Sequence, residues 1–404
     1  MTDAAILRRL VAPAYLPTFF WGITAGATMP IVALSGRALG ATVEVAALLV
    51  GLGTIAEFLI AVPVGKVVDR FGERRTLLLS GGLMIVAMIL AATAPSVAWL
   101  ALAIVLQSPA VVAFIVARQG FIADSVPLHL RARALSTLGG VARAGILVGP
   151  FLAAPTIAAW GPQAGFGVGA AAAIVTAVVV ALAVHDPVHA AGAEDGGRPA
   201  PVRTRDVLRS QRLVFLTIGI GVLAIGLARS AYVVVTPLWA EHIGVSAAQT
   251  AVLFGVVAAV EVSLFFAAGW LSDRYGRAAS AVPCAMLIGI GLVLLPSTAT
   301  FAALMAVAVI VGVGNGLGSG IVMTLGVDSA PAQGRGAFLS LWRMFSLVGH
   351  NGASIVVAGV TALASLAASA VTVGGLAVLG GFWMLRWLPA HDRRRRGRDR
   401  RPTA

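Results

Sequence analysis

The stretch GKVVDRFGERR, residues 65–75, places four basic and two acidic side chains between two long apolar segments. A second stretch, GWLSDRYGR at residues 269–277, repeats this pattern 204 residues further along the chain. Glycine lets a chain reverse sharply, so each stretch is typical of a short charged turn between two helices. The repeat indicates a duplicated unit, in which the residues that correspond are Gly65, Asp69, Arg70 and Gly72 with Gly269, Asp273, Arg274 and Gly276.

The composition places most of the chain in lipid. Of its 404 residues, 59% are hydrophobic and only 11% are charged, whereas a soluble protein carries about 25% charged residues. Apolar runs of about 18 residues or more are the signal of membrane-spanning helices. We predict an all-α membrane protein with twelve such helices, at residues 15–34, 45–66, 75–94, 97–121, 134–156, 164–185, 213–238, 247–270, 278–296, 300–324, 336–360 and 367–388.

Positive charge is distributed unevenly between the two sets of loops. The net charge is +13, yet one set of loops holds only Arg37. Basic loops stay in the cytoplasm, which predicts a multi-pass protein of the cell membrane with both termini cytoplasmic. The basic tail HDRRRRGRDRR, residues 391–401, is expected to be solvated and to touch anionic lipid headgroups. Nucleic acid is not an expected partner.

A long polar segment divides the chain into two halves. Residues 186–212 combine Gly, Pro, Ala and charges, which is typical of a flexible linker. The offset of 204 residues also relates Asp124 to Asp328 and Gly145 to Gly349, and paired six-helix repeats are a transporter architecture. The predicted organisation is a six-helix bundle at residues 1–190, a linker at 191–212, a second bundle at 213–390 and a basic tail at 391–404.

The two charged turns suggest a conformational latch. Asp69 and Asp273 could each face the positive end of a helix in the opposite half. The glycines let the helices approach and the chain reverse. The alternative reading is a topology signal with a tight turn. The arginines are expected to pair with acids that end helices 4 and 10, so that the predicted latch also contains Arg70, Arg74, Arg274, Asp124 and Asp328.

Both turns resemble the loop 2–3 signature of the major facilitator superfamily, G-x-x-x-D-R-x-G-R/E-R, and the resemblance covers essentially the whole chain. It implies twelve helices in two six-helix bundles, a central cavity between them and alternating access by rocking.

A second motif lies in helix 5. The run from Gly145 through Gly149 and Pro150 resembles the antiporter signature G-x-x-x-G-P-x-x-G-G, with Ala153 and Ala154 in place of the last two glycines. The resemblance implies an exporter, and the alternative reading is a kinked, closely packed helix. The helix 4 motif R-x-x-Q-G matches only at Gln107, because Ile104 and Ser108 stand at its Arg and Gly positions.

Two carboxylates lie inside predicted helices. Glu57 and Glu261 correspond at the same offset, and each precedes the aspartate of its turn by twelve residues, which is about 18 Å of helix. Ionisable residues at membrane depth indicate function. Protonation would neutralise such a carboxylate and release a basic partner, so either residue is a candidate proton carrier.

Basic side chains lie at similar depths. Family architecture sets helix 5 against helix 8 and helix 2 against helix 11, which implies that Arg143 lies near Glu261 and that Glu57 lies near Arg343 or His350. The alternative is a set of static ion pairs that only hold the bundle together. Arg229 could instead meet an anionic substrate.

The glycine-rich run VGVGNGLGSG, residues 311–320, lacks the ending of a phosphate loop and follows no strand, which excludes a nucleotide site. We expect it to give close packing or flexibility, with Asn315 lining the cavity.

The leading hypothesis is secondary active export of small amphiphilic or lipophilic molecules by proton antiport. On the same fold, the alternatives are a symporter or facilitator that imports a polar solute, and a lipid translocator. No nucleophile with its base and no cluster with metal-ligand spacing occurs in the sequence, which argues against an enzyme. The expected partners are a small-molecule substrate, protons and the bilayer, with no cofactor or metal, and the chain is expected to act as a monomer.

Overall fold

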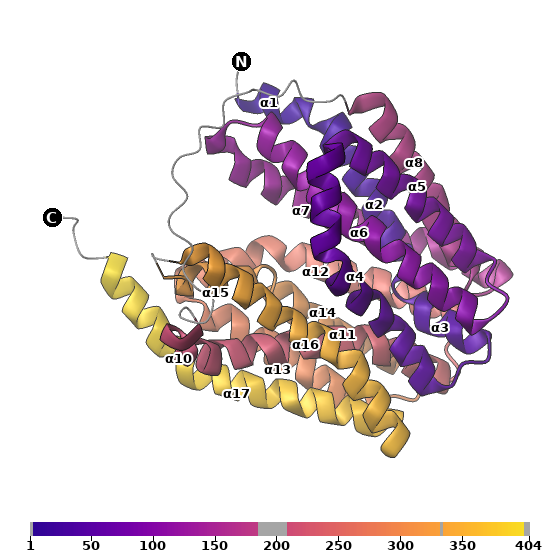
Figure 1. The fold of residues 1–404 in the computed structure, drawn as a ribbon. Coiled ribbons are helices and arrows are strands. Elements are labelled where there is room, and N and C mark those ends of the chain that lie inside the picture. Colours follow the sequence, from indigo (N-terminus) through magenta and orange to yellow (C-terminus); the bar gives the residue numbers. More distant parts are fainter. Residues whose placement is uncertain (1–2, 185–207, 332–333, 400–404) are drawn as a thin grey trace. The chain divides into compact units, whose positions relative to one another are not determined.

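The computed structural model describes residues 3–184, 208–331 and 334–399, and these residues contain helices and no strand (Figure 1). Side chains at Asp69, Asp124 and a few other helical positions are outside this description, as is most of the predicted linker. The helices of the first part are α1 (Asp3–Arg9), η1 (Val11–Tyr15), α2 (Leu16–Thr28), α3 (Ile31–Ala38), α4 (Val43–Phe71), α5 (Glu73–Ala92), α6 (Val97–Ser125), α7 (Leu128–Trp160) and α8 (Ala164–Ala183).

The second part begins with two short helical segments and continues with long helices. Its last helix runs to Asp399, so that the backbone of the predicted tail is largely helical. The elements are α10 (Arg212–Val214), η2 (Phe215–Gly219), α11 (Ile220–His242), α12 (Ala247–Tyr275), α13 (Ala278–Leu294), η3 (Leu295–Ser297), α14 (Phe301–Leu317), α15 (Ile321–Ser329), α16 (Arg335–Leu363) and α17 (Leu366–Asp399).

The number of membrane spans agrees with the predicted twelve. Within the described residues, 11 helices are long and apolar enough to cross a membrane, and one bent pair supplies a twelfth. This pair joins Val11–Thr28 to Ile31–Ala38 at an angle of 43°. The first predicted span, at 15–34, therefore corresponds to this bent pair. Pro30 caps the second segment, and because proline lacks an N–H group it interrupts the helical hydrogen bonds.

The chain divides into two compact units. Unit 1 comprises Met1–Ala193 with Ala240–Ala258, and unit 2 comprises Glu194–Trp239 with Ala259–Ala404. In unit 1, α2 packs against α7 and α8, and α5 packs against α6 and α8. In unit 2, α13 lies between α14 and α17, the yellow helix of Figure 1.

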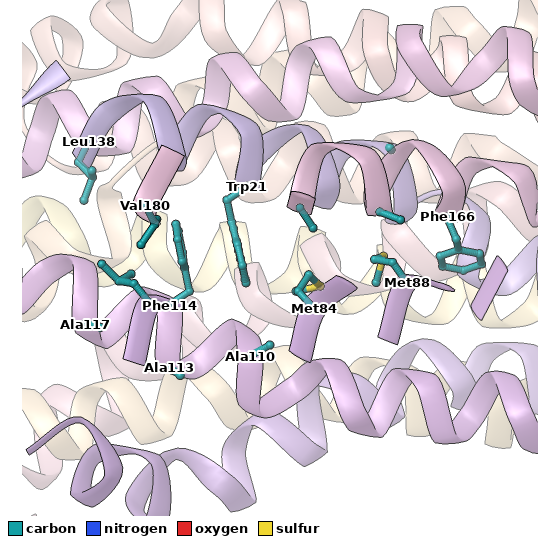
Figure 2. Packing of buried hydrophobic residues seen from close by; sticks show 14 of the residues in the cluster. Trp21, Met84, Met88, Ala110, Ala113, Phe114, Ala117, Leu138, Phe166 and Val180 are labelled. Carbon is teal, nitrogen blue, oxygen red and sulfur yellow. The ribbon is translucent and has the colours of Figure 1, made fainter. Parts of the chain in front are cut away.

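The core of unit 1 is apolar and aromatic. The rings of Trp21 and Phe114 stack with centroids 3.9 Å apart, and Phe114 is fully buried. Figure 2 shows this stacked pair, with Met84, Met88 and Phe166 continuing the same cluster. In lipid, such close packing replaces the hydrophobic effect as the force that holds helices together.

The duplication extends to helix packing. A Cβ atom on Gly145 of α7 would collide with the carbonyl oxygen of Phe19, and one on Gly349 of α16 would collide with that of Leu223. The two glycines are 204 residues apart in the sequence, and so are the two residues that they approach. The turns also repeat, since Gly72 and Gly276 have φ angles of 76° and 105°, a region that favours glycine. Each unit therefore uses the same glycines to set the same backbone geometry.

Candidate functional site

A break in the helical backbone marks the candidate site in unit 2. Helix α14 ends at Leu317, Gly320 has a φ of 76°, and α15 begins at Ile321. The span predicted at 300–324 is present as Phe301–Ser329, with this break inside it. The cause lies in the glycine-rich run, because Gly318 faces Cys284 and Arg229 so closely that a Cβ atom would collide with both. Broken helices in transporters expose backbone groups at membrane depth, where they bind ions or substrate.

Arg229 of α11 holds the end of α14. Its Nη2 donates to the main-chain carbonyl of Asn315 at 3.3 Å and contacts the Cys284 Sγ at 3.5 Å. The last carbonyl groups of a helix carry partial negative charge. The guanidinium group therefore stabilises the helix end that the break leaves inside the unit.

Glu261 of α12 joins the same group of residues. The Asn315 Nδ2 donates to the Glu261 Oε1 at 3.0 Å. Tyr232 and Cys284 are within electrostatic reach of Glu261, and His350 is within reach of Arg229. We call the set formed by Arg229, Tyr232, Glu261, Cys284, Asn315 and His350 the Glu261 cluster; it draws on α11, α12, α13, α14 and α16.

Three of the predicted coupling residues thus meet in unit 2, Glu261, Asn315 and Arg229, and a fourth, His350, lies within electrostatic reach of Arg229. The predicted pairs of Arg143 with Glu261, and of Glu57 with Arg343 or His350, join residues of different units and stay predictions. In unit 1, no hydrogen bond or ion pair of the Glu57 carboxylate is found among the described residues. Arg343 lies on an exposed position of α16.

The sequence prediction missed a second half-buried arginine inside a predicted span. Arg118 of α6 donates from Nη1 to the Thr18 Oγ1 at 3.4 Å, and its Cζ lies 5.4 Å from the centroid of the Phe114 ring. Its Nε is buried and has no partner among the described residues. The missed signal was an arginine inside the predicted span at 97–121, since charge at membrane depth indicates function.

The charged turn of unit 2 contains a buried ion pair. Arg277 donates from Nε to the Asp328 Oδ2 at 2.8 Å and from Nη1 to the Asp273 Oδ1 at 2.7 Å. The Arg277 and Asp328 side chains are each only 9% exposed. Burial acts to lower the pKa of Arg277, but the hydrogen bonds and charges of Asp328 and Asp273 outweigh it and raise this pKa.

The partner of Asp328 differs from the expected one. Arg277 was not among the predicted latch residues, whereas Arg274, which was, lies over the rings of Trp270 and Tyr275. The pair of Arg277 with Asp328 forms within unit 2, and contacts of the latch across the two halves stay a prediction. Among the described residues, no neighbour closely approaches Gly65 or Gly269.

The charged turn of unit 1 is arranged differently. Arg74 donates from Nε to the carbonyl oxygen of Val184 at 2.6 Å, at the C-terminal end of α8. Arg70 lies over the Phe71 ring. The residue that corresponds to Arg277 is Glu73, so this turn has no arginine at that position. The side chains of Asp69 and Asp124 are outside the described part of the chain.

The predicted antiporter motif forms a close helix contact. A Cβ atom on Gly149 would lie 2.5 Å from the Ile23 carbonyl oxygen and 2.6 Å from the Ala27 nitrogen. Pro150 follows inside α7, where no helix break occurs. The motif thus brings α7 against the α2 backbone, which is the packing that the alternative reading predicted.

A further ion pair lies in the part of unit 1 that includes α3 and the end of α11. The Arg37 Nε lies 3.1 and 3.0 Å from the two carboxylate oxygens of Glu241, and its Nη1 donates to the Ala41 carbonyl at 2.6 Å. Arg37 and Glu241 are themselves 204 residues apart. The sequence prediction used Arg37 only to assign the loops.

Comparison with known proteins agrees with this fold. No curated protein matches the chain. A crystal structure of a peptide transporter in complex with alafosfalin has a TM-score of 0.77 at 14% identity, covering 97% of this chain and 99% of that one. A bacterial homolog of the human lysosomal transporter Spinster, inward-facing and unoccupied, gives 0.72 at 14% identity, with both chains covered fully at 100%.

A D-xylose–proton symporter gives a TM-score of 0.70 at 16% identity, covering 96% of this chain and 98% of that one. At these identities the structures show the fold alone. The sequence model of the Major Facilitator Superfamily matches residues 15–354, and this match together with the helical architecture indicates a transporter and not an enzyme. The chain belongs to the Major Facilitator Superfamily of membrane transporters.

Proposed function

We propose that the protein is a proton-coupled exporter of small amphiphilic or lipophilic molecules in the cell membrane, with both termini in the cytoplasm. The observation that carries the proposal is the hydrogen bond of Glu261 to Asn315 beside Arg229, at a broken helix inside unit 2. A carboxylate at this depth is energetically costly, so its presence indicates a function. Taking up a proton would remove its charge and weaken its hold on neighbouring groups.

The Gly145–Pro150 segment supports export through its resemblance to the antiporter signature, and its close packing on α2 is compatible with that role. Close packing of Gly145 and Gly149 of α7 against the α2 backbone keeps these two helices together. The predicted domains, at residues 1–190 and 213–390, would rock about the substrate site, and Asp69 and Asp273 would form the latch of the cytoplasmic side.

An alternative is import of a polar solute by symport on the same fold. The observation in its favour is that Arg229 and Glu261 supply opposite charges within one cluster, which a zwitterionic solute would match.

The direction of coupling can be measured in proteoliposomes. With an inward proton gradient, ethidium and tetraphenylphosphonium would serve as lipophilic probes, and a mixture of labelled amino acids as polar probes. Antiport predicts that lipophilic probe flux opposes the proton flux and collapses with an ionophore. Flux of a polar probe in the same direction as the protons would establish symport. Lipophilic probe flux that ignores the gradient would reject the proposal.

A further inference from the structure

We propose that Asn315 is a positioning residue that links the protonation of Glu261 to the break between α14 and α15. This inference rests on the proposed function of Glu261 as the proton carrier. Asn315 touches both features at once. Its side-chain amide donates to Glu261 at 3.0 Å, while its main-chain carbonyl accepts from Arg229 at 3.3 Å and from the Ser319 Oγ at 3.5 Å.

Two atoms of this arrangement have unused hydrogen-bonding capacity. The Asn315 Oδ1 and the Arg229 Nε are buried and have no partner among the described residues. Buried polar atoms usually have partners, so each exception calls for an explanation. Because both atoms are shielded from solvent, the groups able to use them are those already inside the cluster.

Protonation of Glu261 changes which bonds are possible. The ionised carboxylate only accepts hydrogen bonds, which fits the Nδ2 donor that now faces it. A protonated carboxyl carries an O–H group, and this group would donate to Oδ1 after the amide inverts. The Nδ2 would then turn away from Glu261. The proton adds to one Glu261 oxygen on arrival and leaves the same atom on release.

The change would reach the helix break through the backbone. A Cβ atom on Gly316 would lie 3.2 Å from the Glu261 Cα and 2.9 Å from the Leu264 Cβ, so α14 and α12 are in close contact beside Asn315. Tyr232, Cys284 and His350, from α11, α13 and α16, are among the groups within electrostatic reach of the carboxylate or its arginine. Once Glu261 is neutral, Arg229 no longer has an anion beside it. The hydrogen bond of Arg229 to the Asn315 carbonyl at the end of α14 would then change in strength.

The single cysteine of the chain reports on this break. Cys284 is buried against Arg229 and next to Gly318, so alkylation by N-ethylmaleimide requires the break to open. Labelling rates are compared at each pH between wild type, Glu261→Gln, Asn315→Leu and the double variant in proteoliposomes. The Glu261 carboxylate also acts directly on the Cys284 thiol, so the ratios are compared between the Asn315 and Asn315→Leu backgrounds, which share this direct effect.

We expect Glu261→Gln to change the labelling rate of wild type at least threefold at pH 8 and little at pH 5.5. In the Asn315→Leu background, the same substitution should change the rate less than 1.5-fold at every pH. Asn315→Gln is a second variant in case Asn315→Leu fails to fold. Asn351→Ala is the matched control, since Asn351 in α16 also has a buried, unpartnered Oδ1, and it should leave the Glu261→Gln effect intact.

An equal effect of Glu261→Gln in the presence and absence of Asn315 would overturn the proposed link. Absence of labelling at every pH would also overturn it, because the break would then stay closed. The proposed function fails separately, if Glu261→Gln transports with the pH dependence of wild type.

A pocket in unit 1 carries a second, independent inference. Its volume is about 360 Å³, and it is lined by residues around the end of α1, η1 and the end of α6. The first span begins at Val11, and the span of α6 ends at Ile122. The pocket therefore lies at the depth of lipid headgroups. Its lining consists of Ile6, Arg9, Leu10, Pro13, Phe121, Ser125 and Pro127.

We infer that this pocket binds the headgroup of an anionic phospholipid. Arg9 is the only charged residue of the lining, and Ser125 adds a hydroxyl group, whereas the other walls are apolar. The Arg9 guanidinium could form charge-assisted hydrogen bonds with a phosphate group. The start of an acyl chain could pack against Leu10 and Phe121.

Native mass spectrometry tests this site with the purified full-length chain. We expect retention of phosphatidylglycerol over phosphatidylethanolamine of equal chain length, and a loss of at least threefold in that preference for Arg9→Gln. The control Arg8→Gln removes the adjacent exposed charge, which does not line the pocket, and should keep the preference. Equal losses in both variants, or no preference in wild type, would overturn the inference.

Discussion

Glu57 and Glu261 occupy equivalent positions in the two halves, yet their surroundings differ. Glu261 accepts a hydrogen bond from Asn315 and lies in a cluster with Arg229, whereas Glu57 has no such bond among the described residues of unit 1. The positions in unit 1 that correspond to Arg229, Cys284, Asn315 and His350 hold Ala25, Ser80, Val111 and Ile146.

The comparison shows that the duplication kept the backbone and diversified the polar groups. Positive φ angles recur at Gly72 and Gly276. The close approach of Gly145 to the α2 backbone recurs where Gly349 approaches the α11 backbone. Backbone geometry is demanded by the fold of each bundle. Buried charges are costly and serve a function, so each half keeps only those that its role requires.

The largest expected effect is a loss of stability when the charged turn of unit 2 loses its arginine, a loss that the turn of unit 1 should not show. Arg277→Ala would leave the buried Asp328 carboxylate without its partner, and breaking a buried pair costs about 3–5 kcal/mol. Because the pKa of Arg277 is raised, its stabilising charge is present at neutral pH and is lost only as pH rises far into the alkaline range. The loss should therefore be the same at pH 6 and pH 8, measured by thermal unfolding in detergent.

The control for this change is Glu73→Ala, at the corresponding position in unit 1, together with the exposed Arg274→Ala. Surface charges contribute about 0–1 kcal/mol. An unfolding temperature of Arg277→Ala equal to that of Arg274→Ala would contradict a structural role of the pair.

The next prediction tests whether the two close glycine contacts, α7 on α2 and α16 on α11, contribute equally to stability. Gly145→Ala and Gly349→Ala, at corresponding positions, force a methyl group against a neighbouring main chain, and overpacking costs about 1–3 kcal/mol. Gly139→Ala in α7 and Gly352→Ala in α16 meet open space and should be neutral or slightly stabilising. Unfolding temperatures of the four variants decide the point. If only one of the two substitutions lowers the unfolding temperature, the packing of the two halves is not equivalent.

The third prediction concerns the two carboxylates directly. Glu261→Gln should lower proton-driven flux about tenfold, equivalent to about 1.4 kcal/mol, and flatten its dependence between pH 6 and pH 8. Glu57→Gln should keep a pH dependence, because another carboxylate carries the proton. The measurement is ethidium flux in proteoliposomes at imposed pH gradients. The reverse result, with Glu57→Gln flat and Glu261→Gln normal, would assign the proton to unit 1.

The smallest expected effect concerns Arg37 and Glu241, whose side chains are 31% and 37% exposed. Such a pair contributes about 0.2–1 kcal/mol. Arg37→Gln should therefore shift the unfolding temperature slightly, and the shift should be smaller in the Glu241→Gln background, where only the hydrogen bond of Arg37 to the Ala41 carbonyl remains to be lost. A double-mutant cycle with a larger coupling would show that this pair matters more than its exposure indicates.

Several site features followed from the sequence, and others did not. Glu261 and Asn315 were identified because a carboxylate inside an apolar run is unusual and because a glycine-rich helix packs closely. Their direct hydrogen bond was not predicted, since it depends on how α12 and α14 cross. Arg277 was overlooked because its role depends on burial, and the sequence pattern of the turn emphasised Arg274. Arg118 was not predicted, because the motif match in this helix lies at Gln107.

The sequence by itself determined the class of the protein. Apolar runs must become helices in lipid, because unpaired backbone groups are too costly there, and the repeat at an offset of 204 residues fixed the duplicated plan. Only the tertiary structure decided which charges meet. The break at Gly318–Gly320 and the meeting of Arg229, Asn315 and Glu261 depend on helix crossings, and these are set by many small packing contacts that no single motif encodes.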